Sequence, residues 1–423
     1  GNHPHSQERY EALVFGEGDF KGVFKAIKGA TSGRGLDRVF IAGVSPVVLH
    51  DVSSGFNIAE NIYLGEDLND LCGFTEAEVT TLLTAVANEC KFTAAQINEA
   101  RTMMRTYYDG SRFSDEGGEH IYNPTSTFYF LKYLQRTCRY PRKMLDSNLA
   151  PDHSKLAYVA SLAQGEATIL NIVNDGTPLA VVELEDRFGV EQMLASSNTE
   201  AFMLSLLYYL GGLTLADTLS PDGKLILRIP NLVMERLYAH RLREMLLPDA
   251  GVRDEGQIAA EALYSQGRME PLVDFIERRI FPIFDNRDYL QANELMVKTA
   301  FLMLLFNDTF YMIDSETPLN HGYADLTMLL RPEMRQYELL DILLEFKLVK
   351  LNALNLDARA VRTKTREELL ALALVQAEIA NAQKQGQEYS ATLTAKHGAS
   401  LKLRAFAVVA IGFEKWVWQP VPF

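Results

Sequence analysis

Apolar residues recur at helical spacing through most of the first 285 residues. Thr75 and Thr93 each stand three residues ahead of a Glu or a Gln, a spacing that predicts two capped helices between residues 75 and 108. A hairpin is predicted over residues 213–229, with Pro221-Asp222-Gly223 as its turn. Helices are also predicted over residues 22–28, 125–134, 154–166, 199–210, 233–247 and 259–279, and a strand over residues 38–44.

The pattern changes beyond residue 285, where shorter apolar segments predict strands over residues 323–330, 339–349 and 401–413. The second of these strands is almost continuously apolar, yet it carries Glu345 and Lys347 two residues apart. Because side chains of a strand alternate in direction, Glu345 and Lys347 share one face, and Phe346 points to the other.

Asp325 lies in the preceding predicted strand and would join Glu345 and Lys347 if the two strands are neighbours. Two carboxylates would supply hard oxygen ligands for Mg²⁺ or Mn²⁺, and the ammonium group would orient water or stabilise a phosphate. The alternative is a half-exposed strand in which Glu345 and Lys347 form an ion pair without a role in chemistry.

Two flanking features favour the metal site. Glu294 begins a predicted apolar helix and is a candidate third carboxylate, although the helix dipole also favours a glutamate in a first turn. A long helix is predicted over residues 358–393, and the chain that leads into it is basic. This basic stretch would either contact a phosphate backbone or form a solvated loop. Its charged residues are Lys347, Lys350, Arg359, Arg362, Lys364 and Arg366, against the single acid Asp357.

The order of these elements resembles the PD-(D/E)XK nuclease superfamily: a helix with Glu294, a strand with Asp325, a strand with Glu-x-Lys, and then a helix with Gln and Tyr. More closely, it is similar to the nuclease-like domain that accompanies an AAA-ATPase-like domain in many bacterial proteins. Residues 39–79, 107–131, 207–215 and 227–238 are similar to segments of that ATPase-like family. The resemblance covers most of the 423 residues.

The resemblance implies hydrolysis of DNA phosphodiester bonds with Mg²⁺ or Mn²⁺ as the cofactor. Water would attack in line, and the lysine would stabilise the developing charge. The residues that it implies are the metal ligands Asp325 and Glu345, the catalytic Lys347, the accessory carboxylate Glu294, and Gln383 (or Gln385) with Tyr389 on the later helix.

The sequence departs from the family pattern in two places. Gly322-Tyr323-Ala324-Asp325 lacks the arginine of the usual Gly-Arg-x-Asp, which puts a phosphate or structural contact in doubt. A phosphate-binding loop is also missing, because the glycines of residues 29–35 have no Lys-Ser/Thr after them and Gly223-Lys224 is followed by leucine. The chain is therefore expected to be truncated or degenerate relative to a full ATPase module and not to use ATP.

Composition sets the remaining expectations. The chain is 48% hydrophobic and 23% charged, as globular proteins are, and its net charge of −14 argues against indiscriminate binding to nucleic acid. DNA is favoured over RNA as the partner, a homo-oligomer or a protein partner is a further expectation, and no segment is long enough to span a membrane. Cys72, Cys90 and Cys138 show no metal spacing, so reduced, buried thiols in a cytoplasmic protein are expected.

Two aromatic segments leave alternatives open. Trp416 and Trp418 are expected to share a strand face, where they would stack on bases or cover a sheet edge. Tyr107 and Tyr108 precede an Asp-Gly turn and would face a nucleotide or anchor that turn.

These observations predict an α/β protein with three parts. A partial AAA-ATPase-like domain without a phosphate loop is expected over residues 1–125, a helical lid or linker region with a short hairpin over residues 126–285, and a PD-(D/E)XK nuclease-like domain with a mixed central sheet over residues 286–423. A metal-dependent nuclease is the favoured function. The rival is a non-enzymatic interaction or scaffold protein that keeps the nuclease-like fold.

Overall fold

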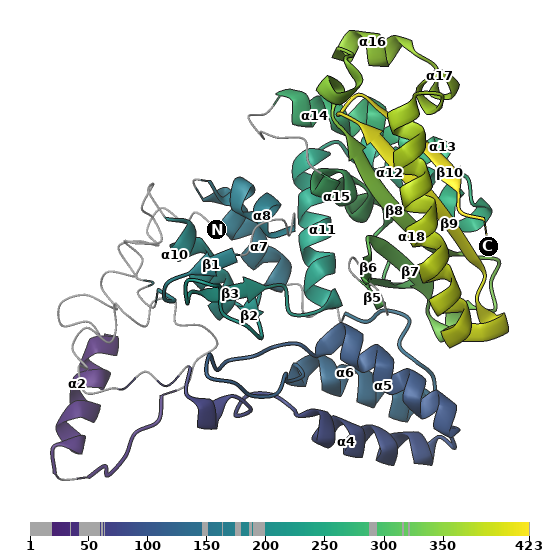
Figure 1. The fold of residues 1–423 in the computed structure, drawn as a ribbon. Helices are drawn as coiled ribbons and strands as arrows, with labels where there is room; N and C mark the ends of the chain where they lie inside the picture. Colours follow the sequence, from purple (N-terminus) through teal and green to yellow (C-terminus); the bar gives the residue numbers. More distant parts are fainter. Residues whose placement is uncertain are drawn as a thin grey trace.

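The protein has a mixed α/β fold, seen here in a computed structural model (Figure 1). The structure describes residues 19–33, 35–41, 60, 62, 64–145, 151–162, 164–173, 179–185, 188, 199–286, 294–314, 317–319 and 322–422. The α/β class expected from the sequence is confirmed. Among the described helices, none is both long and apolar enough to cross a membrane.

Three helices form a layer at the bottom of Figure 1: α4 (Glu76–Glu89), α5 (Ala94–Tyr108) and α6 (Pro124–Thr137). Both predicted capping boxes are confirmed, because the hydroxyl groups of Thr75 and Thr93 accept hydrogen bonds from the backbone N–H three residues later. The predicted first helix is also present as α2 (Asp19–Thr31). Residues 38–41 of the predicted strand are not in a strand, and the rest of it lies outside the described residues.

A disulfide joins Cys90 and Cys138, at the C-terminal ends of α4 and α6, with Cα atoms 5.3 Å apart. The prediction of reduced, separate thiols is therefore wrong for this pair. The two helices pack on each other and so bring together residues 48 positions apart, which no local spacing signals. Cys72 is free and exposed rather than buried.

A second group of helices carries a small antiparallel sheet of order β1-β3-β2, at the left of Figure 1. The predicted hairpin is confirmed, with Gly223 (φ +79°) in its turn. One helix was predicted over residues 154–166, but the chain turns at Gln164, which has φ +64°, and makes two helices. The elements are α7 (Pro151–Ser161), α8 (Gly165–Val173), β1 (Leu179–Val181), α10 (Glu200–Tyr209), β2 (Thr214–Leu215) and β3 (Leu225–Arg228).

Helices α11 (Leu232–Leu246) and α12 (Ala250–Gln266) follow, and the prediction of one helix over residues 259–279 is wrong. Gly267 adopts φ +69° and ends α12, because glycine tolerates this left-handed conformation better than other residues. The chain then continues through α13 (Glu270–Phe275), the π-helical turn η3 (Ile276–Ile280), α14 (Phe281–Asn286) and α15 (Glu294–Leu305).

A five-stranded mixed sheet of order β10-β9-β8-β7-β4 occupies the upper right of Figure 1. Neighbouring strands are antiparallel except β8 and β9, which are parallel. The strand predicted over residues 323–330 is divided at Asp325, since residues before it form a separate hairpin. The strands are β4 (Tyr311–Asp314), β5 (Thr317–Leu319), β6 (Gly322–Ala324), β7 (Leu326–Leu330), β8 (Asp341–Val349), β9 (Leu403–Ile411) and β10 (Lys415–Pro420).

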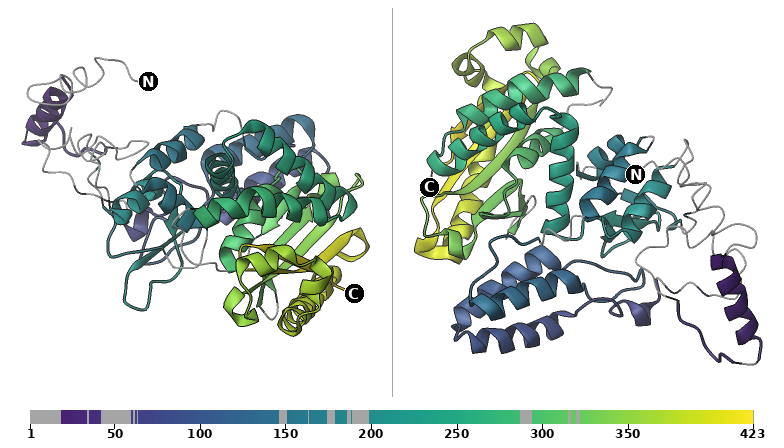
Figure 2. Two further views of the ribbon diagram at one scale, coloured as in Figure 1. Left: turned by 90° about the horizontal axis from the view of Figure 1, so that it is seen from above. Right: turned by 180° about the vertical axis from the view of Figure 1, so that it is seen from behind.

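Helix α18 (Ala373–His397) covers one face of the sheet, and α15 packs on the other (Figures 1 and 2). The single helix predicted over residues 358–393 is wrong, because Lys364 is extended and Thr365 caps a new helix with Glu368. The elements between β8 and β9 are η5 (Leu351–Leu354), α16 (Ala358–Thr363), α17 (Arg366–Leu370), α18 and η6 (Gly398–Ser400).

The apolar residues of β8 enter two different cores. Ile342, Leu344 and Phe346 join the large core that also contains residues of α4–α6, α11, α12 and α15. Leu343 and Val349 face α18 in a second core. Because the large core joins helices from before residue 125 to the sheet, these regions pack as a continuous unit. Their division into the family domains stays a prediction.

Candidate active site

The pairing of β7 with β8 brings Asp325 next to Glu345. Leu326 is opposite Leu344 in the antiparallel ladder, so Asp325, at the bend before β7, falls beside the next residue of β8. Its Oδ2 accepts a hydrogen bond of 2.8 Å from the backbone N–H of Phe346. The bend between β6 and β7 therefore fixes this half-buried carboxylate against the middle of β8.

Glu345 is buried, with 2% of its surface exposed, on the face of β8 that α18 covers. The half-exposed alternative is therefore wrong. Burial is the largest cause that raises the pKa of Glu345, to about 8, and the negative charge of Asp325 is the next. Two carboxylates in one poorly hydrated place disfavour each other's charge, so Glu345 tends to keep a proton at neutral pH.

Lys347 is the third member of the cluster and lies two residues further along the same face. Its Nζ donates a hydrogen bond of 2.8 Å to the carbonyl oxygen of Phe346, and its positive charge acts to lower the pKa of Glu345. The structure thus brings together three of the five candidate site residues. With both carboxylates ionised, one lysine leaves the cluster short of one positive charge.

Helix α18 contributes Tyr389, which is 5% exposed. Burial, and after it the charges of Glu345 and Asp325, raise the pKa of this tyrosine. Gln385 stands one helical turn earlier on the same face and has a buried Oε1 without a hydrogen-bond partner in the described structure.

The structure does not bring Gln383 to the carboxylates. Its Nε2 donates a hydrogen bond of 2.9 Å to the carbonyl oxygen of Pro420, at the end of β10. Six residues separate Gln383 from Tyr389, which places them on different sides of a helix, whereas the four residues from Gln385 place it on the same side. Of the two glutamines that the sequence offers, Gln385 is the one that faces the sheet beside Tyr389.

Several buried oxygen atoms between the sheet and α18 lack a hydrogen-bond partner among the described residues. Buried polar atoms in folded proteins are usually paired, so a group of them indicates a place for water or an ion. Oxygen is also the donor that Mg²⁺ and Mn²⁺ prefer. The atoms are Glu345 Oε1, Thr327 Oγ1, Gln385 Oε1 and Ser390 Oγ.

These observations fit a divalent cation, with Asp325 and Glu345 as its only described acidic ligands. In the part of the chain that the structure describes, no set of three or more His, Cys, Asp or Glu residues is placed to hold a metal. Glu294 begins α15 as predicted, but its side chain lies outside the described residues. A third acidic ligand therefore stays a prediction.

The basic stretch after β8 is partly neutralised. Arg362 pairs with Glu414, and Arg366 pairs with Asp274 at 2.7 Å and with Glu277 at 2.9 Å. These contacts hold α16 and α17 against the sheet edge and η3. Lys350 and Arg359 remain exposed.

The tryptophans of β10 share a face, as predicted, and Trp416 belongs to the core. It is fully buried and stacks on Phe281 with ring centroids 5.5 Å apart. The guanidinium group of Arg366 lies 5.0 Å above the ring of Trp418. For Trp416 the structure supports sheet packing rather than stacking on bases.

The candidate nucleotide-binding features before residue 125 have structural positions instead. Tyr107 and Tyr108 are buried, and their hydroxyl groups donate hydrogen bonds to the carbonyl oxygens of Tyr311 and Met144. The glycines of residues 29–35 lie at the C-terminal end of α2. A phosphate loop uses the backbone N–H groups at the beginning of a helix, so this position is the opposite of what it requires.

No family model, curated protein or solved structure matches this chain.

Proposed function

We propose that this protein is a metal-dependent nuclease that hydrolyses DNA phosphodiester bonds. The observation that carries the proposal is the convergence of Asp325, Glu345 and Lys347 under α18, with a Glu345 oxygen that has no partner in the described structure. The proposal includes the finer assignment of the fold: residues 286–423 as a PD-(D/E)XK-like domain, and the preceding helices as an ATPase-like remnant that lacks the phosphate loop.

Asp325 and Glu345 would hold Mg²⁺ or Mn²⁺, which would supply positive charge at the phosphate and a water of lowered pKa. Glu345 must release its proton for this, so cation binding at neutral pH is expected to release a proton. The Nζ of Lys347, which donates a hydrogen bond to the carbonyl oxygen of Phe346, would turn to the phosphate instead and stabilise its developing negative charge. Tyr389 and Gln385, on the α18 side of the site, would help to position the carboxylates and the lysine.

DNA reaches this site, in our proposal, along the surface that carries Lys350 and Arg359. Arg362 and Arg366 already form ion pairs within the protein, and the net charge is −14, so binding to long duplex DNA is expected to be weak and salt-sensitive. DNA is favoured over RNA on the resemblance alone.

A cleavage assay tests the proposal. Single-stranded and duplex DNA, and RNA of the same sequence, are incubated with the protein in Mg²⁺, in Mn²⁺ and in EDTA. We expect cleavage of DNA with either metal and none in EDTA. Glu345→Gln should reduce the rate at least ~100-fold, because it removes one anionic oxygen ligand. Glu261→Gln, an exposed change on α12, is the matched control and should have no effect.

The rival function, a non-enzymatic interaction protein, is favoured by one observation. Glu345 is almost completely shielded from solvent, and its carboxyl group can stay neutral and structural. Under this rival, no divalent cation binds and no substrate is cleaved. Equal and undetectable cleavage by the wild type and Glu345→Gln would support it.

A further inference from the structure

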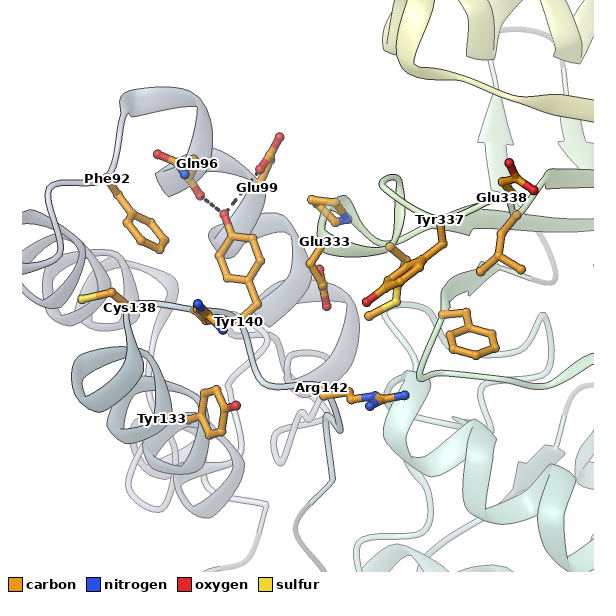
Figure 3. A pocket seen from close by; sticks show the side chains of 15 residues that line it. Phe92, Gln96, Glu99, Tyr133, Cys138, Tyr140, Arg142, Glu333, Tyr337 and Glu338 are labelled. Carbon is orange, nitrogen blue, oxygen red and sulfur yellow. Dashed lines mark hydrogen bonds between the residues drawn. The ribbon is translucent and has the colours of Figure 1, made fainter. Parts of the chain in front are cut away.

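A second site is formed where the three-helix layer meets the connection between β7 and β8. A cavity of about 730 Å³ lies there, between the segment after α6 and the segment that begins with η4 (Pro332–Met334) (Figure 3). Its volume is in the range of small-molecule sites, roughly 300–1,000 Å³. The cavity lies next to the C-terminal end of β7, and Asp325 lies just before the N-terminal end of the same strand. The cavity is therefore separate from the carboxylate cluster.

One wall of the cavity is held in place by contacts that need no ligand. The carbonyl oxygens of Pro141 and Arg142 accept hydrogen bonds from the guanidinium group of Arg331, which is fully buried. The hydroxyl group of Tyr140 donates a hydrogen bond of 2.9 Å to the carbonyl oxygen of Gln96. The disulfide fixes the residue before this segment. Such preorganisation reduces the entropy lost on binding.

The same wall presents two arginines to the cavity. Arg139 and Arg142 both line it and are exposed, and neither guanidinium group has an ion pair or hydrogen bond within the described ranges. Glu333 also lines the cavity, but it pairs with Arg331 and its carboxylate oxygens are buried. The arginines therefore remain available to an anionic group of a ligand.

Aromatic rings form much of the remaining surface. Tyr140 and Tyr337 come from the two walls and lie on either side of Glu333 (Figure 3). Tyr337 is 53% exposed, so its ring is accessible to a ligand. Aromatic side chains that accompany arginines suit a flat ring attached to a phosphate, since every base has a face that can stack on an aromatic ring. The further rings are Phe92, Tyr133 and Phe310.

We propose that this cavity binds a nucleotide, with the base among the aromatic rings and the phosphate at Arg139 and Arg142. Glu99 and Glu338, which also line the cavity, would accept hydrogen bonds from amino groups of the base. A free mononucleotide and one unit of a single strand carry the same chemistry. The site needs neither a metal nor cleavage, so it stands independently of the nuclease proposal.

Calorimetry of the full chain in EDTA tests this site with AMP, adenosine and a short oligo(dA). We expect saturable AMP binding and weaker adenosine binding, because adenosine lacks the phosphate. The double change Arg139→Glu/Arg142→Glu should weaken AMP binding at least ~10-fold, and Tyr337→Ala should weaken all three ligands. Lys132→Glu reverses a charge on the exposed surface of α6 and is the matched control. Glu345→Gln should bind AMP normally.

The same experiment distinguishes a free nucleotide from one unit of a nucleic-acid strand as the ligand. Binding of oligo(dA) that is at least ~10-fold tighter than AMP and falls steeply with salt indicates a strand, and equal binding indicates a free nucleotide. The proposal is overturned if the wild type binds neither AMP nor oligo(dA) saturably. It is also overturned if the arginine change, or Arg139→Gln/Arg142→Gln should the first variant not fold, leaves AMP binding unaltered.

Discussion

Asp341 and Glu345 stand four residues apart on the same face of β8, and both are buried, yet their surroundings differ. Asp341 accepts hydrogen bonds from the backbone N–H groups of Leu330 and Lys402, at 2.7 and 2.8 Å, and pairs with Arg335. Glu345 faces another carboxylate and has an oxygen without a described partner. Removing a buried carboxylate whose partners are all in place leaves those partners unsatisfied and destabilises a fold, whereas a buried carboxyl oxygen without a partner indicates a place for water or an ion.

The largest expected difference concerns stability. Asp341→Ala leaves Arg335 and two backbone N–H groups without their acceptor, so the free energy of unfolding should fall by about 3–5 kcal/mol. Glu345→Gln should not lower it at pH 7, because glutamine resembles the neutral carboxyl group that the wild type must form on folding. Urea unfolding in EDTA measures both. Equal losses would remove the distinction between the two carboxylates.

Lys347 and Lys402 are expected to differ in their effect on the cleavage rate. The Nζ of Lys402 donates to the carbonyl oxygens of Arg335 and Tyr337, which is a structural role. Lys347→Met should reduce the cleavage rate ~100-fold or more, about 2.7 kcal/mol, whereas Lys402→Met should leave the rate of the folded protein nearly unchanged. A similar loss of rate in both variants would contradict the role given to Lys347.

The raised pKa of Glu345 predicts how stability depends on pH. The folded protein holds this proton up to about pH 8, whereas the unfolded chain loses it near the ordinary glutamate pKa of 4.5. Its contribution to stability is therefore complete below pH 4.5 and is lost as the pH rises through 8, by at most ~1.4 kcal/mol per pH unit. Thermal melts in EDTA should show that Glu345→Gln gains stability relative to the wild type over this range. If stability depends on pH in the same way in the two proteins, Glu345 does not hold this extra proton in the folded state.

The smallest expected effects separate the glutamines of α18. Gln385→Ala and Tyr389→Phe should each lower cleavage roughly 10-fold, because both side chains face the carboxylate side of the sheet. Gln383→Ala should have no effect on cleavage, since that side chain bonds to the end of β10. The opposite result would restore Gln383 as the residue that acts at the site.

Much of the candidate site could be predicted from the sequence, because it rests on alternation and strand pairing. A strand that carries Glu345 and Lys347 on one face needs only a neighbouring strand with Asp325 to assemble the cluster. The bend at Asp325 could not be predicted, since it depends on the separate pairing of β6 with β5. Helical spacing alone could have favoured Gln385 over Gln383, as only Gln385 is one turn from Tyr389.

Local signals predict the beginnings of α4 and α5 correctly, whereas the division of the chain between β8 and β9 was not predicted. The boxes at Thr75 and Thr93 fixed the beginnings of α4 and α5 correctly. The same signal at Thr365 marks the beginning of α17, but the continuous helical pattern around it predicts a single longer helix. The disulfide depends on the packing of α4 on α6 and has no local signal at all.

Calorimetric titration of the metal-free protein with Mn²⁺ tests the central claim, that Asp325 and Glu345 form a cation site. We predict saturable binding by the wild type at pH 7, accompanied by proton release, and its loss in Asp325→Ala/Glu345→Ala, while Glu261→Gln binds normally. No saturable binding by the wild type, or equal binding by the double variant, would contradict the account and leave the cluster a structural one.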